Sequence, residues 1–210
     1  MSESAPSQSL RLAVACETPV TLLSKLLERQ RAEEPETPVA LSEVSPTELA
    51  AGIKEGRFDA GLMLEPLQGT PLRAEALWQD DLAIAVPLRS PLLEHPRIPV
   101  EALADYPLVM WGSGAREAIN LRVRELLDNL NTPTQVLQYV HSFQVMAVLV
   151  AAGYGIGFSG RSHIAASRAL NIVMRPLAGT PRPLTTHLVY PGAHKSPRLH
   201  RLASRATTVQ

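Results

Sequence analysis

The stretch SFQVMAVLVAAGYGIGFSGR, residues 142–161, says most about how this chain folds. Ser142 is suited to cap a helix, because a serine hydroxyl accepts a hydrogen bond from an N–H group of the first turn. The residues after it are mostly apolar, which predicts a mostly buried helix. Gly153 suits the left-handed backbone at a helix end, and 156–158 then predicts a short buried strand before a turn at Ser159-Gly160. Such a unit places a helix start and a strand end near one sheet edge, where open α/β folds bind ligands.

Three glycines in this stretch, Gly155, Gly157 and Gly160, match the G-x-G-x-x-G pattern of dinucleotide-binding loops. That pattern binds a pyrophosphate when a strand precedes the glycines, a helix follows them, and an acidic residue for the ribose lies about 20 residues further on. Here a helix precedes the glycines, and no Asp or Glu occurs after Asp128. The glycines therefore indicate a tight return from helix to strand rather than a nucleotide site.

The composition is that of an ordinary soluble protein, with 45% hydrophobic residues and 20 acidic against 20 basic side chains. A chain of 210 residues is long enough for one large domain or two small ones. The single cysteine, Cys16, excludes an internal disulfide framework and favours a reducing compartment. No apolar run reaches the roughly 18 residues of a membrane span, and residues 1–9 lack the features of a signal peptide. We therefore expect a cytoplasmic protein without membrane contact, with residues 1–9 as a flexible leader or linker remnant.

Charge is segregated along the chain. All 20 acidic residues precede residue 129, whereas residues 161–210 contain eight basic side chains and no acidic one. A basic C-terminal segment can indicate nucleic-acid binding. The segment contains too few aromatic residues to stack on bases. We therefore favour the interpretation that it packs back onto the acidic N-terminal part.

The first half of the chain alternates apolar strands with amphipathic helices. Its predicted strands are 10–15, 39–44, 59–64 and 78–86. A helix is predicted from Thr18, with Pro19 at the first helical position, to about residue 34. A second helix begins at the capping box Ser45-Pro46-Thr47-Glu48 and ends near residue 56. Two strand–helix units followed by a strand indicate a parallel sheet.

The second half repeats this organisation after a proline-rich loop at 89–99. Its predicted strands are 108–111, 136–140, 156–158, 172–175 and 186–190. Helices are predicted at 115–130, after Ser142, and at 197–205, the last of them short and basic. The chain is therefore expected to form two α/β halves.

Several motifs together resemble the effector-binding domain of LysR-type transcriptional regulators. They are LRLAVA at 10–15, ELAAGIKEGRFDAGLML at 48–64, WQDDLAIAVPLRSPLLEHPRIPVEALADYPLVMW at 78–111, the opening stretch, and HLVYP at 187–191. The resemblance covers about residues 10–205. It implies an α/β fold of two Rossmann-like lobes joined by two crossover strands, similar to type 2 periplasmic solute-binding proteins. Lobe I would then be 10–86 with 185–210, and lobe II would be 87–184.

The resemblance also implies how such a domain works. A small effector binds in the cleft between the lobes and changes lobe angle or dimer geometry. DNA is contacted only through a winged helix-turn-helix that has no counterpart before Leu10. Homodimers or homotetramers are expected, with helices 18–34 and 115–130 as candidate contact surfaces. The alternative is a solute-binding receptor of a transport system.

Four helices with polar starts, near Thr18, Ser45, Ser113 and Ser142, should share the ligand edge. Helix starts offer free N–H groups and partial positive charge, so a small carboxylate is the ligand class they favour. The family places effector contacts on the same loops. Carried over to this sequence, the candidate contacts are Cys16, Glu17, Thr18, Ser45, Thr47, Gly112, Ser113, Ser142 and Phe143.

Two charged residues modify this picture. Arg161, just after the strand 156–158, could add a bidentate contact to a carboxylate. Glu17 would repel an anion unless it is paired or turned away, and it could instead favour an amine or hydroxyl on the effector. Ser45, Ser113 and Ser142 also serve as helix caps whether or not a ligand binds.

Enzymatic, metal and redox functions are not indicated. The residues Gly157-Phe158-Ser159-Gly160-Arg161 miss the last glycine of a G-x-S-x-G elbow, and no acid follows to complete a triad. The six histidines lack metal-site spacing, so neither a metal nor a cofactor is expected. With Cys16 as the only cysteine, sensing through an internal disulfide is excluded.

Overall fold

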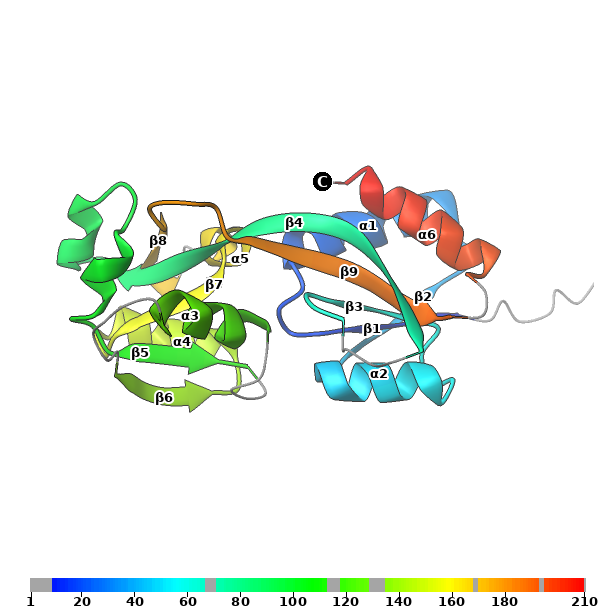
Figure 1. The fold of residues 1–210 in the computed structure, drawn as a ribbon. Helices are drawn as coiled ribbons and strands as arrows, with labels where there is room; N and C mark the ends of the chain where they lie inside the picture. The colour runs from blue at the N-terminus through cyan, green and yellow to red at the C-terminus, as the bar shows by residue number, and fades with distance from the viewer. Residues whose placement is uncertain are drawn as a thin grey trace, which may run out of the picture. The chain divides into compact units, whose positions relative to one another are not determined.

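The computed structural model describes residues 9–66, 71–112, 118–128, 135–167, 170–192 and 195–209. The chain divides into two compact units (Figure 1). Unit 1 contains the chain up to Trp78 and from Thr185 onward, and unit 2 is Gln79–Leu184. Strand β4 (Leu72–Pro87) carries the chain from unit 1 to unit 2, and strand β9 (Pro183–Pro191) carries it back.

Unit 1 is a three-layer α/β sandwich. Strand β1 (Leu10–Val14) lies parallel to both β2 (Val39–Glu43) and β3 (Ala60–Met63), and β3 pairs antiparallel with β9. Leu10, Leu12 and Val14 point to one face, where they pack under helices α1 (Val20–Glu33) and α6 (Pro197–Thr207). The alternate residues Ala13 and Ala15 pack on the other face with Leu49 and Ile53 of helix α2 (Pro46–Lys54). The period of two along β1 thus supplies both halves of the core.

Unit 2 repeats the pattern with different partners. Strand β5 (Leu108–Trp111) lies parallel to β6 (Val136–Val140) and β7 (Ile156–Gly160). The second half of β4 pairs antiparallel with β7 and with β8 (Ile172–Pro176). Helices α3 (Ala118–Asp128), α4 (Phe143–Ala151) and α5 (Arg161–Ala166) complete the unit, together with two short 3-10 turns, η1 (Pro91–Glu94) and η2 (Val100–Leu103).

The pairing of β4 explains where the chain divides. The boundary predicted from sequence lies after Val86, at the end of the predicted strand. In the structure residues 82–87 pair with β7 and β8, so they belong to unit 2, and the division falls at Trp78–Gln79. Residues 1–8 of the predicted leader lie outside the described residues.

The opening stretch forms the predicted helix, stop and strand. The Ser142 hydroxyl accepts a hydrogen bond from the Val145 N–H at 3.3 Å, and Gly153 has a φ of +82° after the helix ends. The glycines serve close packing: a Cβ on Gly157 would lie 2.2 Å from the Met146 sulfur. A helix-to-strand return, not a phosphate loop, therefore explains the G-x-G-x-x-G pattern.

Two details of that stretch differ from the prediction. The turn expected at Ser159-Gly160 is wrong, because both residues continue β7 by pairing with Ala83 and Leu82 of β4. Helix α4 is less buried than its composition indicated, since the Val145 and Val148 side chains are 48% and 59% exposed. An apolar helix can therefore lie at the surface with only one face packed.

The start of α1 also differs from the prediction. Pro19 is the N-cap, not the first helical residue, and the helix begins at Val20. The Thr18 hydroxyl donates to the Leu62 carbonyl at 3.3 Å, across the sheet edge, and so does not cap the helix. By contrast, Ser45 caps α2 as predicted, accepting from the Glu48 N–H at 3.2 Å.

The basic C-terminal segment packs back onto the acidic N-terminal part, as its charge indicated. Arg205 of α6 lies 2.7 Å from Glu33 and 3.0 Å from Glu34, at the end of α1. Arg201 forms a further ion pair with Glu34, and Lys195 pairs with Glu75. Within the described residues no helix has the length and apolar character needed to cross a membrane.

Candidate functional site

The predicted site residues of unit 1 lie at the carboxyl ends of two neighbouring parallel strands. Cys16, Glu17 and Thr18 follow β1, and Ser45 follows β2. The Val44 N–H donates to the Val14 carbonyl at 3.0 Å, which holds the two strand ends together. Thr47 is exposed on the first turn of α2. The structure therefore brings this set to one edge of unit 1.

The start of α1 is the helix start at this edge that best suits an anion. Pro19 makes no side-chain capping bond, and the first turn of α1 contains no acidic residue. The first N–H groups of a helix have no intrahelical acceptor and carry partial positive charge. The start of α2 is less suitable, because Ser45 already caps it, Pro46 has no N–H, and Glu48 lies in the first turn.

Residues around the start of α1 are enclosed. The Glu17 and Thr18 residues are 6% and 3% exposed, and Cys16 is half-buried. The Thr18 N–H donates to the Ala15 carbonyl at 3.0 Å, so Thr18 is held by its backbone and its side chain. A ligand would therefore meet a fixed loop rather than one that must be ordered on binding.

The predicted residues of unit 2 lie at the carboxyl ends of β5, β6 and β7. Gly112 follows β5 with a φ of +124°, and its N–H donates to the Val140 carbonyl at 2.9 Å. Ser142 caps α4, and Phe143 is only 2% exposed. Ser113 lies outside the described residues. Arg161 begins α5, is exposed, and forms no ion pair with any residue that the structure describes.

An aromatic cluster joins these strand ends. The His163 ring stacks on Phe143, with centroids 4.2 Å apart and planes at 21°. Trp111 meets both rings edge-on, at 5.6 Å from Phe143 and 5.5 Å from His163. The Trp111 indole N–H donates to the Phe158 carbonyl at 2.7 Å, which fixes its orientation. Phe143 thus belongs to the core of this cluster, and sequence reasoning missed His163 and Trp111 entirely.

Burial favours the neutral form of His163. Burial lowers the pKa of His163, and the negative charge of Asp80 opposes this only in part. Asp80 itself accepts hydrogen bonds from the Ser162 N–H at 3.0 Å and the Ser162 hydroxyl at 2.6 Å. A neutral imidazole offers one donor and one acceptor nitrogen. The group suits hydrogen bonding to a ligand rather than ion pairing.

Two buried polar atoms near this cluster lack a partner in the described part of the chain. They are the His163 Nδ1 and the hydroxyl of Ser159, a residue that is fully buried in β7. Buried polar atoms in native proteins nearly always have a hydrogen-bond partner, which can be water or a ligand. This end of β7 therefore offers two polar groups to such a partner.

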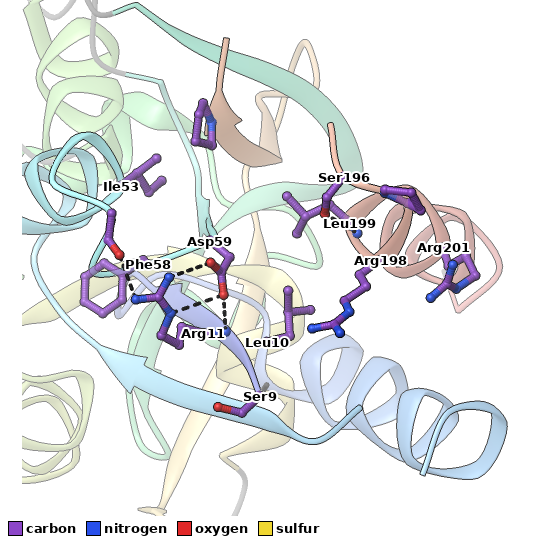
Figure 2. A pocket seen from close by; sticks show the side chains of 13 residues that line it. Ser9, Leu10, Arg11, Ile53, Phe58, Asp59, Ser196, Arg198, Leu199 and Arg201 are labelled. Atoms are coloured by element: carbon purple, nitrogen blue, oxygen red, sulfur yellow. Dashed lines mark hydrogen bonds and ion pairs between the residues drawn. The ribbon is translucent and has the colours of Figure 1, made fainter. Parts of the chain in front are cut away.

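A pocket of about 770 Å³ elsewhere in unit 1 has an arginine in its wall that is already paired (Figure 2). Its wall contains Arg11, which lies 2.7 Å from one Asp59 oxygen and donates to the other at 3.3 Å. The same guanidinium donates to the Gly56 carbonyl at 2.7 Å. Because these bonds use the guanidinium, Arg11 has little left to offer an anion. Among the described residues no group of three metal-ligating side chains occurs either.

Both units together match a known protein family. The family described as LysR substrate binding domain matches residues 3–209, nearly the whole chain. The chain belongs to this family. It is the effector-binding domain of a LysR-type regulator and not an enzyme, and the predicted two-lobed fold is confirmed.

Curated relatives in this family are regulators. The HTH-type transcriptional regulator AlsR of Bacillus subtilis is 24% identical over 136 residues, which is 65% of this chain and 45% of AlsR. The Hca operon transcriptional activator HcaR of Escherichia coli is 24% identical over 164 residues, which is 76% of this chain and 54% of HcaR. The matches thus span about half the length of these relatives.

Solved structures share the fold at low sequence identity. The BenM effector binding domain with its effector benzoate has a TM-score of 0.86 and 20% identity, covering 96% of this chain and 91% of that one. Full-length CbnR complexed with target DNA has a TM-score of 0.84 and 18% identity, covering 96% of this chain and 70% of CbnR.

Proposed function

We propose that this LysR-family domain binds a small carboxylate effector at the helix starts of both units. The observation that carries the proposal is the start of α1, which has neither a side-chain cap nor an acidic residue in its first turn. Helix starts of this kind bind anions through backbone N–H groups. BenM, whose domain has the same fold, binds benzoate, which supports the ligand class.

The proposed contacts are the predicted site residues of each unit. In unit 1 the carboxylate would meet Thr18 and the first N–H groups of α1, with Cys16, Ser45 and Thr47 beside them. In unit 2 the contacts would be the loop of Gly112 and Ser113, the start of α4 at Ser142 and Phe143, and Arg161. His163 adds a neutral hydrogen-bonding group stacked on Phe143.

Effector binding would act on a DNA-binding segment of a longer protein. The curated relatives are about twice as long as their matches to this chain, and CbnR has been solved with its target DNA. A ligand shifts a conformational equilibrium only by binding its two states unequally. We therefore expect a carboxylate to bind preferentially to one arrangement of the two units.

Thermal-shift measurements with single carboxylates test the proposed ligand class. Benzoate, salicylate and pyruvate should be compared with benzamide and glucose, because a ligand that binds the folded state raises the Tm by mass action. Thr18→Val removes the hydroxyl that fixes this loop on the Leu62 carbonyl, so it is expected to reduce the carboxylate-induced rise. The proposal is wrong if amines or sugars alone raise the Tm.

Ser142→Ala and Ser196→Ala provide a matched control. Each removes the capping serine of a helix, so each should destabilise the free protein by about 1 kcal/mol. Only Ser142 belongs to the proposed site, so only Ser142→Ala should also reduce the Tm rise that the carboxylate produces. Equal ligand responses in the two variants would remove Ser142 from the site.

We also propose that a second copy of the chain covers the edges formed by β2 and β6. Each of these strands stands at one end of the strand order, and each presents apolar side chains to solvent. These side chains, and those of the neighbouring helices, are 39–49% exposed: Val20, Leu41, Leu121, Val136, Leu137 and Tyr139. An exposed apolar edge strand readily pairs with another chain, and exposed apolar patches mark interaction sites.

Leu137→Lys tests the proposed dimer. The charge would have to be buried against the second copy, so sedimentation velocity should show a shift from dimer to monomer. Leu88→Lys is the matched control, because Leu88 is 56% exposed but lies outside both edge strands. An unchanged sedimentation coefficient for Leu137→Lys would contradict the placement of the interface on β6.

A further inference from the structure

Unit 2 contains a pocket of about 630 Å³ that no predicted site residue lines. Its walls come from residues 87–91 at and after the end of β4, from Tyr106 and Pro107 before β5, and from residues 151–153 and Gly155 at and after the end of α4, with Asn171 before β8. The volume lies within the range of small-molecule sites. All of these residues belong to unit 2, so the pocket is complete within one unit.

The walls of this pocket are preformed. A Cβ on Gly155 would lie 2.2 Å from the Pro107 carbonyl oxygen, which shows how closely the two segments pack. The same carbonyl accepts from the Ile156 N–H at 2.9 Å, and the Ser90 N–H donates to the Pro87 carbonyl at 3.1 Å. Asn171 holds a φ of +58°, a conformation that asparagine tolerates better than most residues. Little ordering would be needed on binding.

The lining combines apolar surface with one cation. The apolar part comes from three prolines (87, 91 and 107), from Leu88 and from two alanines (151 and 152). Tyr106 adds an aromatic ring. Arg89 is the only charged residue among those that line the pocket, and it is exposed. It forms no ion pair with any residue in the described part of the chain. A carboxylate is the group that best complements a guanidinium of this kind.

The end of α4 at the pocket does not oppose an anion strongly. Carbonyl groups at a helix end carry partial negative charge. Part of this charge is offset, because the Gly153 N–H donates to the Val150 carbonyl at 2.9 Å and the Tyr154 N–H to the Leu149 carbonyl at 3.0 Å. The net character of the pocket is therefore apolar with one positive charge.

We propose that this pocket is a second ligand site, for a small monocarboxylate with an apolar or aromatic body. Arg89 holds the carboxylate, and the apolar body lies against Leu88, Pro107 and Ala152. The site is separate from the helix starts of the proposed function and does not depend on them. It gives the domain a second place at which a metabolite of similar chemistry binds.

NMR spectra of the 210-residue chain test the proposal with benzoate, phenylacetate and hexanoate as probes. At least one of them should shift the amide signals of Gly153, Gly155 and Asn171 in a saturable way, whereas neutral benzamide should not. Arg89→Gln should raise the Kd read from these signals about tenfold or more, because the charged partner is lost. Arg97→Gln, which removes another exposed arginine of unit 2 away from the pocket, should leave the Kd unchanged.

Further variants separate this site from the helix-start site. Thr18→Val should leave the pocket signals and their Kd unchanged, even if it abolishes the Tm response of the proposed function. Ala152→Leu should block the pocket by filling it. The proposal is overturned if none of the three carboxylates shifts the pocket amides, or if Arg89→Gln binds as tightly as the wild type.

Discussion

Gly155→Ala is expected to destabilise the protein by about 3 kcal/mol or more. A Cβ at this position would lie 2.2 Å from the Pro107 carbonyl oxygen and 3.0 Å from its carbonyl carbon. Because these are backbone atoms, no side-chain rotation relieves the clash. Separating the segments would also weaken the bond from the Ile156 N–H to the Pro107 carbonyl, where β5 and β7 pair. Urea denaturation monitored by tryptophan fluorescence measures the change in free energy of unfolding.

Gly153→Ala is the matched control for this prediction. Gly153 has a φ of +82°, and a Cβ added there would have no atom within 4 Å, so an alanine meets backbone strain and no clash. Such strain destabilises by only about 1–2 kcal/mol. Gly155→Ala should therefore be clearly the less stable of the two. Equal losses would mean that the contact with Pro107 relaxes easily.

The elements with strong local signals could be predicted from sequence. Ser45 and Ser142 cap helices in the structure as their sequence contexts indicated, and the strands 108–111 and 136–140 match their predicted bounds. Strands and helices that depend on pairing with residues distant in the sequence were harder to predict. The first residues of β4, from Leu72, alternate apolar and charged side chains only briefly and with alanines, which are uncommon in strands, and the six-residue α5 is too short to give a helical period.

The site residues also divide into those with a local sequence signal and those that depend on distant contacts. The polar helix starts could be proposed from capping patterns alone, because caps depend on residues only three apart. His163 could not, because its role depends on stacking with Phe143 and contact with Trp111, 20 and 52 residues away in the sequence. The absence of a side-chain cap at the start of α1 could not be predicted either, since Thr18 turns its hydroxyl to the Leu62 carbonyl through a contact across the sheet.

Arg205→Gln is expected to lower the free energy of unfolding by about 3 kcal/mol, because it leaves buried acceptors without their charged partner. The Arg205 side chain is 9% exposed. It contacts three side chains at the C-terminal end of α1. It donates to Glu33 at 2.7 Å and to Gln30 at 2.8 Å, and it lies 3.0 Å from Glu34. The α1–α6 contact buries much of the apolar face of unit 1, so thermal unfolding of the whole unit should reflect the loss.

The pH dependence of stability should identify the ionic part of this effect. Hydrogen bonds from Arg201, and then from Arg205 and Gln30, lower the pKa of Glu34 from about 4.5 to about 2 despite its burial. A carboxyl whose pKa is lowered by folding stabilises the protein above its unfolded pKa and loses that contribution as the pH falls. Wild-type stability should therefore decline between about pH 4.5 and about pH 2. Arg205→Gln should flatten this decline, and Arg31→Gln, which removes an exposed arginine of α1, should leave it unchanged. A decline of equal steepness in Arg205→Gln would show that Arg205 does not contribute to the low pKa of Glu34.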